Sequence, residues 1–182
     1  EHITVFWSRL NIPSLLTVCK ANGHWKAAFY LDCSYNQFDN AVDLMIAHSA
    51  ECWSHQSLKE TIVKVHNSEV YFKVIDFYLQ EHPLLLNDLL VELSLKLDHT
   101  RVVHKLRQVK HLALGQKYLL HVQRENSLAV NEALNELSVE AEDHKCLRES
   151  ITNYDNFDQL SLARRLERHD LMEFRRIAAF LY

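Results

Sequence analysis

Histidine is abundant in this sequence, with twelve residues, and imidazole is a common ligand of zinc. His99, His104 and His111 form the densest group, at spacings of 5 and 7. A helix grips zinc with two histidines spaced by four, as in H-E-x-x-H, and that motif is absent. We therefore expect the histidines to be solvated or to cap helices, and we predict no metal site.

A cysteine nucleophile would need an activated thiolate and a positioned base. The four cysteines are Cys19, Cys33, Cys52 and Cys146, with no C-x-x-C pair among them. Cys146 follows His144 by two residues, which places the two side chains on different sides of a helix. The cysteines are predicted to be buried thiols in a reducing compartment rather than catalytic groups or disulfides.

Carboxylates and phosphate-binding loops also give no catalytic pattern. The acidic run 140–143 is typical of a solvated helix start, and the G-x-x-x-x-G-K loop is absent from a chain with only two glycines. We predict no catalytic residue and no cofactor, so the chain is not expected to be an enzyme.

Charge is unevenly distributed along the chain. The formal net charge is −4, yet residues 96–124, here called the basic segment, carry a net charge of +6. Its cations are Lys96, Arg101, Lys105, Arg107, Lys110, Lys117 and Arg124. The segment could be a solvated face or a docking strip for an acidic helical partner. Nucleic acid is disfavoured, because the segment contains one aromatic residue, Tyr118, for bases to stack on.

The elements that must carry these residues are helices. Tyr71, Val74, Ile75, Tyr78 and Leu79 follow the i, i+3, i+4, i+7, i+8 pattern of an apolar helical stripe. Only 2 Gly and 2 Pro occur, which favours short links between helices over hairpins and long loops. We predict an all-α fold of twelve helices near 13–20, 24–35, 39–48, 57–66, 69–81, 84–94, 98–109, 113–125, 127–138, 141–153, 158–169 and 171–182.

Several residues are predicted to start or stop these helices. Pro83 after His82 indicates a stop followed by a new first turn. The predicted N-terminal caps are Asp39, Ser57 with Glu60, Asp98 and Asp158. Helices this short need neighbours for stability, so we expect about six stacked hairpins, as in helical repeat arrays.

The stack is expected to be one continuous segment over residues 1–182, because no Gly/Ser-rich linker or low-complexity run interrupts it. No apolar run is long enough to cross a membrane, and no secretory signal is visible. The chain begins without Met and stops within a helical pattern, so we expect a fragment of a longer protein.

Several blocks, read in order, resemble the clathrin heavy chain, and together they run across nearly all 182 residues. They are Phe6-Trp7-Ser8-Arg9, Asn11-Ile12-Pro13, Pro83-Leu84-Leu85-Leu86-Asn87-Asp88-Leu89-Leu90, Leu97-Asp98-His99-Thr100-Arg101, Val130-Asn131-Glu132, Tyr154-Asp155-Asn156-Phe157-Asp158 and Glu173-Phe174-Arg175-Arg176-Ile177-Ala178-Ala179. The region resembled is the proximal leg, near the trimerisation hub. The resemblance implies a right-handed α-α superhelix of clathrin heavy-chain repeats.

The same resemblance implies a function. It suggests a structural leg segment that packs with other heavy chains in the lattice of coated pits and coated vesicles, cytoplasmic and peripheral, serving endocytosis and intracellular transport. It also implies clathrin light chain, an acidic protein with a long central helix, as the partner of the basic segment. Arg101 and Lys110 stand where the family is basic, whereas Gln108, Gln116 and Leu120 replace basic residues of the family.

Four histidines of the basic segment could make such contacts pH-sensitive, because imidazole titrates near neutrality. They are His99, His104, His111 and His121, which we expect in exposed links. Two other functions remain open: a helical-repeat adaptor of a vacuolar sorting or tethering complex, and a small helical enzyme with a deep pocket lined by titratable groups.

Overall fold

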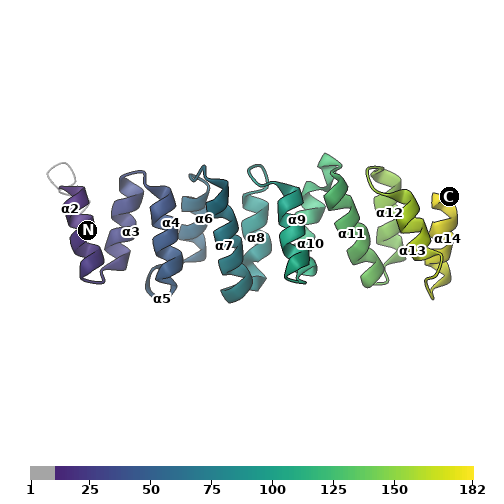
Figure 1. The fold of residues 1–182 in the computed structure, drawn as a ribbon, viewed down its shortest axis with the longest axis horizontal. Coiled ribbons are helices and arrows are strands. Elements are labelled where there is room, and N and C mark those ends of the chain that lie inside the picture. The colour runs from purple at the N-terminus through teal and green to yellow at the C-terminus, as the bar shows by residue number, and fades with distance from the viewer. Residues whose placement is uncertain (1–10) are drawn as a thin grey trace. The chain divides into compact units, whose positions relative to one another are not determined.

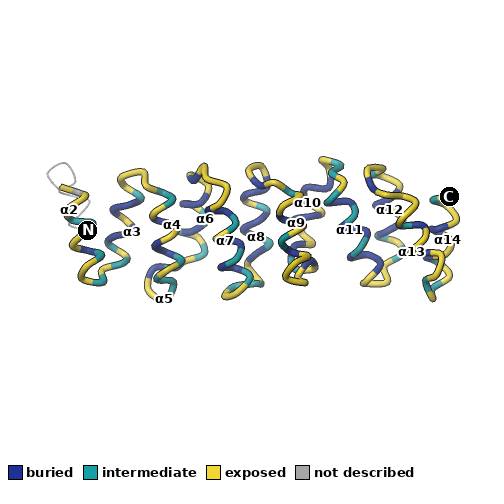
Figure 2. The backbone as a smooth tube through the Cα atoms, viewed as in Figure 1, coloured by how far each residue is buried: buried dark blue, intermediate teal, exposed yellow. Residues whose placement is uncertain are grey.

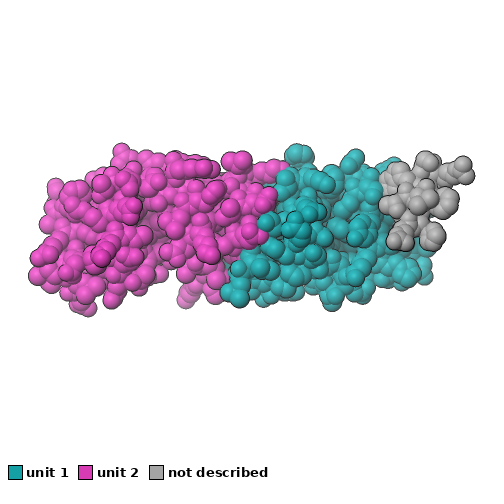
Figure 3. Space-filling model, turned by 180° about the vertical axis from the view of Figure 1, so that it is seen from behind, with its two compact units in different colours: residues 1–85 teal, residues 86–182 magenta. Residues whose placement is uncertain are grey.

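The structure is a computed structural model that describes residues 11–182, so Trp7 and Arg9 of the first resembling block lie outside it. The described residues form helices joined by turns and bends, with no β-strand among them (Figure 1). They divide into two compact units, residues up to Leu85 and residues 86–182, coloured separately in Figure 3. The all-α prediction is confirmed, and the prediction of one uninterrupted domain stays a prediction.

The first unit is a series of short helices in which each packs on near neighbours in the chain. Helix α3 packs on α2 and α4, and α4 also contacts α6 and α7. The helices are α2 (Ile12–Ala21), α3 (Trp25–Ser34), α4 (Phe38–Ala47), α5 (Ser49–Cys52), α6 (His55–Ile62), α7 (Ser68–Glu81) and the 3-10 turn η2 (Pro83–Leu85).

The second unit repeats this arrangement in two rows. Helix α8 packs on α10 and α12 on α14, whereas α9 packs on α11; Figure 1 shows α9, α11 and α13 in front of α8, α10 and α12. Its elements are α8 (Leu86–Glu92), α9 (His99–Gln108), η3 (Leu112–Gly115), α10 (Gln116–Val122), η4 (Gln123–Glu125), α11 (Leu128–Glu140), α12 (His144–Asn153), α13 (Gln159–Leu166) and α14 (Met172–Leu181).

Each of the twelve predicted helices is present, and the sequence reading missed α5. The segments predicted at 84–94 and 113–125 are α-helical only in part, since 3-10 turns occupy their ends. Helix α7 ends before His82, and η2 begins at Pro83, as predicted.

Two of the four predicted N-terminal caps are correct. Asp98 accepts hydrogen bonds from the N–H groups of Thr100 and Arg101 at 2.9 and 3.2 Å, and Asp158 accepts one from Ser161 at 2.9 Å. The predictions for Asp39 and Ser57 are wrong, because both lie inside helices that begin earlier, after Gln37 and Ser54. Asp39 instead places a negative charge in the first turn, where the helix dipole favours it.

Several helices end in the same left-handed conformation, which glycine usually adopts but which mostly other residues adopt in this chain. Gly23, Asn36, Lys110 and Glu142 all have a left-handed backbone, with φ between 54° and 72°. In each case the next residue donates its N–H to the carbonyl five positions earlier, as in His111 to Leu106 at 2.9 Å. This is the Schellman cap, which a non-glycine residue occupies at a cost of about 1 kcal/mol.

Buried residues recur along the helices of each unit and form its apolar core (Figure 2). Near the C-terminal end it consists of one cluster around Phe174: Val139, Leu147, Ile151, Phe157, Leu166, Phe174, Ile177 and Ala178. The cysteine prediction holds for Cys19 and Cys52, whereas Cys33 and Cys146 are only half-buried. Burial raises the pKa of Cys33 and Cys52, which keeps both thiols protonated and unreactive.

Tryptophan rings stack on histidines at the C-terminal ends of two helices of the first unit. Trp25 lies parallel to His48 at 3.5 Å between ring centroids, and Trp53 lies parallel to His82 at 3.7 Å. Both histidines follow the last residue of a helix, α4 and α7. These are capping histidines of the kind that the sequence reading expected.

A buried asparagine acts as a clamp in the second unit, because it hydrogen-bonds the link before α11 to the link between α12 and α13. Asn131 is fully buried, and its Nδ2 donates to Asn126 Oδ1 at 2.7 Å and to the carbonyl of Asn156 at 3.0 Å. Asn156 Nδ2 in turn donates to the carbonyl of Asn126 at 2.8 Å. Two of the blocks that resemble clathrin, 130–132 and 154–158, therefore meet at one hydrogen-bond network.

Asp32 is a buried charge whose removal should stabilise the first unit. It is 1% exposed and forms an ion pair with Lys20, Nζ to Oδ2 3.4 Å. Burial raises the pKa of Asp32, and Lys20 offsets this only partly. The native state thus binds the proton more tightly, so the free energy of unfolding falls as pH rises from the unfolded-state pKa to the folded-state pKa. We expect Asp32→Asn to remove that fall and to add about 1 kcal/mol at neutral pH, because Lys20 is 39% exposed and stays solvated without its partner.

Urea unfolding at about pH 4 and about pH 7 measures this effect. The matched control is Asp43→Asn, because Asp43 is about half exposed and pairs with Lys73 at 3.0 Å. A loss of stability in Asp32→Asn at neutral pH would contradict the expectation.

Candidate functional site

The basic segment does not form one surface. Four of its cations, Arg101, Lys105, Arg107 and Lys110, belong to α9 or its C-terminal end, whereas Lys117 belongs to α10 and Arg124 to η4. Helices α9 and α10 lie in different rows, and each turns its buried residues towards the core between the rows. Their exposed faces therefore point to opposite sides of the unit.

The outer face of α9 carries Arg101, His104, Lys105 and Gln108, at helical spacings of three and four. Lys96 precedes this helix in an exposed turn and Lys110 ends it, so basic side chains extend over about 15 Å along α9. Next to this face, α11 presents Glu132 and Glu136, which limits the width of the basic surface.

Arg107 is already held by the protein. Its Nε and Nη2 both contact Glu136 Oε2 of α11, at 3.0 and 2.8 Å. This pair links two neighbouring helices of one row and engages the Arg107 side chain within the protein.

The outer face of α10 is mixed. Lys117, His121 and Arg124 surround Leu120, which is 49% exposed. Leu120 is one of the positions where the family is expected to be basic, and its exposure gives this face an apolar centre.

Three of the four histidine candidates are exposed, and one is not. His104, His111 and His121 face solvent, but only His111 lies in a link between helices, because His104 and His121 lie on α9 and α10. His99 is the first residue of α9, with a side chain 12% exposed. The expectation that all four sit in exposed links is therefore wrong.

His99, at the start of α9, connects this helix to α10 and η4 through its side chain. Its Nδ1 lies 2.6 Å from the hydroxyl of the buried Tyr118, and its Nε2 lies 3.0 Å from Glu125. Burial raises the pKa of Tyr118, so its hydroxyl keeps the proton and can donate it to Nδ1. The tautomer with a proton on Nε2 then donates to Glu125. His55 repeats the contact in the first unit, 2.7 Å from Tyr78.

Sequence reasoning missed the cations that follow the basic segment. Lys145 and Arg148 on α12, with Arg175 and Arg176 on α14, are all exposed. Acidic residues close to them in sequence cancel their charge when the net charge of a segment is summed. Sorting each helix into an exposed and a buried face would have found them.

The described residues show no group of three or more histidine, cysteine, aspartate or glutamate side chains placed to hold a metal ion. In the same part of the chain, no helix is long and apolar enough to cross a membrane.

Comparison with known proteins gives one consistent family. A family model described as a region in clathrin and VPS matches residues 1–86 and 90–182. The chain is 53% identical to clathrin heavy chain 1 of Oryza sativa subsp. japonica, 50% to the clathrin heavy chain of Dictyostelium discoideum and 47% to clathrin heavy chain 2 of Homo sapiens. Each match covers all 182 residues of this chain and 11% of the relative. The helical hairpins of each unit agree with this match over residues 1–86 and 90–182, and the chain belongs to the clathrin repeat family.

Proposed function

We propose that this chain is a structural leg segment of a clathrin coat, cytoplasmic and peripheral on coated pits and vesicles, that packs laterally against other heavy chains. The observation that carries this proposal is the whole-length match to clathrin heavy chains, together with short hairpins stacked in the manner of a repeat array. In such an array each repeat contacts its neighbours, so the segment supplies stiffness and long lateral surfaces. Weak contacts suffice, because many legs engage at once. This function requires no catalytic group, and we propose that the segment is not an enzyme.

Clathrin light chain is the proposed partner of the α9 face. Arg101 and Lys110 support this assignment, since they stand at basic positions of the family and at opposite ends of an exposed helical face. An acidic helix laid along α9 would meet Lys96, Arg101, Lys105 and Lys110 in turn. Attraction of this kind is exposed to solvent, so it should weaken with salt.

Binding of a light-chain central helix by calorimetry tests this partner. We expect Arg101→Glu with Lys110→Glu to weaken binding at least about tenfold at about 50 mM salt, because two attractive contacts become repulsive. The matched control, Lys117→Glu with Arg124→Glu, changes the net charge equally on the other side of the unit and should have little effect. Binding lost only in the α10 pair, or no binding by the unaltered chain at low salt, would contradict the assignment.

Histidine titration is a proposed modulator of these contacts. His104, His111 and His121 face solvent beside the cations of the basic segment, so their protonation would add positive charge to it. His99 differs, because Tyr118 and Glu125 occupy its ring nitrogens.

A helical-repeat adaptor of a vacuolar sorting complex is the second candidate, since the matching family is described as a region in both clathrin and VPS. The full gene distinguishes the two, because a coat leg requires a trimerising segment further along the chain.

A further inference from the structure

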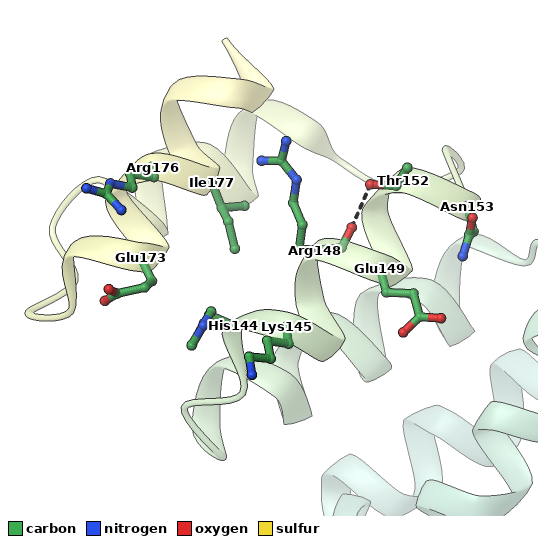
Figure 4. A pocket seen from close by; sticks show the side chains of 9 residues that line it. All are labelled: His144, Lys145, Arg148, Glu149, Thr152, Asn153, Glu173, Arg176 and Ile177. Carbon is green, nitrogen blue, oxygen red and sulfur yellow. Dashed lines mark hydrogen bonds between the residues drawn. The ribbon is translucent and has the colours of Figure 1, made fainter.

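A groove separates α12 and α14 on the outer side of their row. Its volume is about 520 Å³, within the range of sites that bind side chains or small ligands. Ile177 points from α14 towards α12 at its centre, and His144 faces it from the start of α12 (Figure 4). Ile177 is 4% exposed and belongs to the hydrophobic cluster around Phe174, so the floor of the groove is continuous with the core.

The rim of this groove carries a small net positive charge. Lys145 and Arg148 come from α12 and Arg176 from α14, against two carboxylates, Glu149 and Glu173, which lie on opposite sides of the groove in Figure 4. Among the described residues, no ion pair joins these carboxylates to the three cations. The cations therefore retain much of their capacity to attract negative charge.

One edge of the groove is already ordered. The Arg148 guanidinium lies over the ring of Phe180, 3.8 Å from its centroid, and Phe180 is 54% exposed. Arginine and aromatic side chains are enriched among the residues that dominate binding energy at interfaces. A preformed pair of this kind loses little conformational entropy on binding.

We propose that the α12–α14 groove binds a short helical segment of a partner protein, with one bulky apolar side chain over Ile177 and flanking carboxylates against Lys145, Arg148 and Arg176. The surface that lines the groove is mostly apolar, which argues against a free phosphate or another small anion as the occupant. The site is distinct from the α9 face, so its failure would leave the proposed light-chain contact untouched.

Methyl NMR of the 182-residue chain tests this site through the methyl signals of Ile177, assigned with an Ile177→Val variant. The probe is a synthetic helical peptide that presents leucine flanked by glutamates, with two control peptides in which serine replaces leucine or lysine replaces glutamate. We expect a saturable shift of the Ile177 methyl signals with the first peptide alone.

Charge reversal provides the matched variants. Arg148→Glu with Arg176→Glu should weaken peptide binding about tenfold, whereas Arg164→Glu with Arg168→Glu on the exposed face of α13 and just after it should not. Circular dichroism confirms that both pairs remain folded. Equal weakening by the two pairs, equal binding of the serine peptide, or an unmoved Ile177 signal at millimolar peptide would overturn the proposal.

Discussion

Replacing Phe174 by alanine is expected to lower the free energy of unfolding of the second unit by about 3–5 kcal/mol. The ring is fully buried at the centre of the C-terminal cluster and also contacts the rings of His144 and His169, at centroid distances of 6.4 and 4.4 Å. Its removal would leave a cavity that helices α12, α13 and α14 can close only by moving together.

Urea unfolding followed by circular dichroism measures this loss. Phe180→Ala is the matched control, since it removes the same ring from the same helix at a position 54% exposed. We expect that control to cost less than about 1 kcal/mol. Similar losses from the two substitutions would show that the cluster does not support the fold as described.

Asn131→Ala is expected to cost about 2–3 kcal/mol, although it removes only a small polar group. The substitution leaves Asn126 Oδ1 and the carbonyl of Asn156 without the donor that both receive from Asn131 Nδ2. The position is fully buried, so water replaces that donor poorly.

Hydrogen exchange distinguishes this clamp from a general loss of packing. In Asn131→Ala the amides of residues 154–158 should exchange faster than those of α14, because the link loses its anchor before the core opens. Asn153→Ala, at an exposed position of α12, is the control and should change neither quantity. Uniformly faster exchange throughout the second unit would contradict the clamp.

The fold was predictable because the apolar period of 3.6 survives in nearly every helix. Of the stripe predicted for α7, Tyr71, Val74, Ile75 and Tyr78 are buried, and Leu79 is half-buried. The caps were harder to place, because α4 and α6 begin after Gln37 and Ser54, neither of which caps its helix with a side-chain hydrogen bond. Asp39 therefore lies in the first turn of α4 and not at its N-terminal cap.

The candidate site was less predictable, because residues adjacent in sequence separate in space when a hairpin divides them. The basic segment spans α9 and α10, whose exposed faces point apart. The role of His99 also depends on two distant residues, Tyr118 and Glu125, so no local pattern indicates it. The resemblance to clathrin supplied the function, which periodicity and composition alone could not reach.

Replacing a segment of a clathrin heavy chain by this chain tests most directly whether the chain is a clathrin leg segment. Residues 1–182 would replace the corresponding segment of the Dictyostelium discoideum clathrin heavy chain, to which they are 50% identical, and the purified chimaera would be examined for cage formation by electron microscopy. A coat leg predicts closed cages in a yield comparable with the unaltered heavy chain, and a chimaera carrying Phe174→Ala should form fewer. A chimaera that folds and trimerises but forms no cages would contradict the assignment of this chain as a clathrin leg segment.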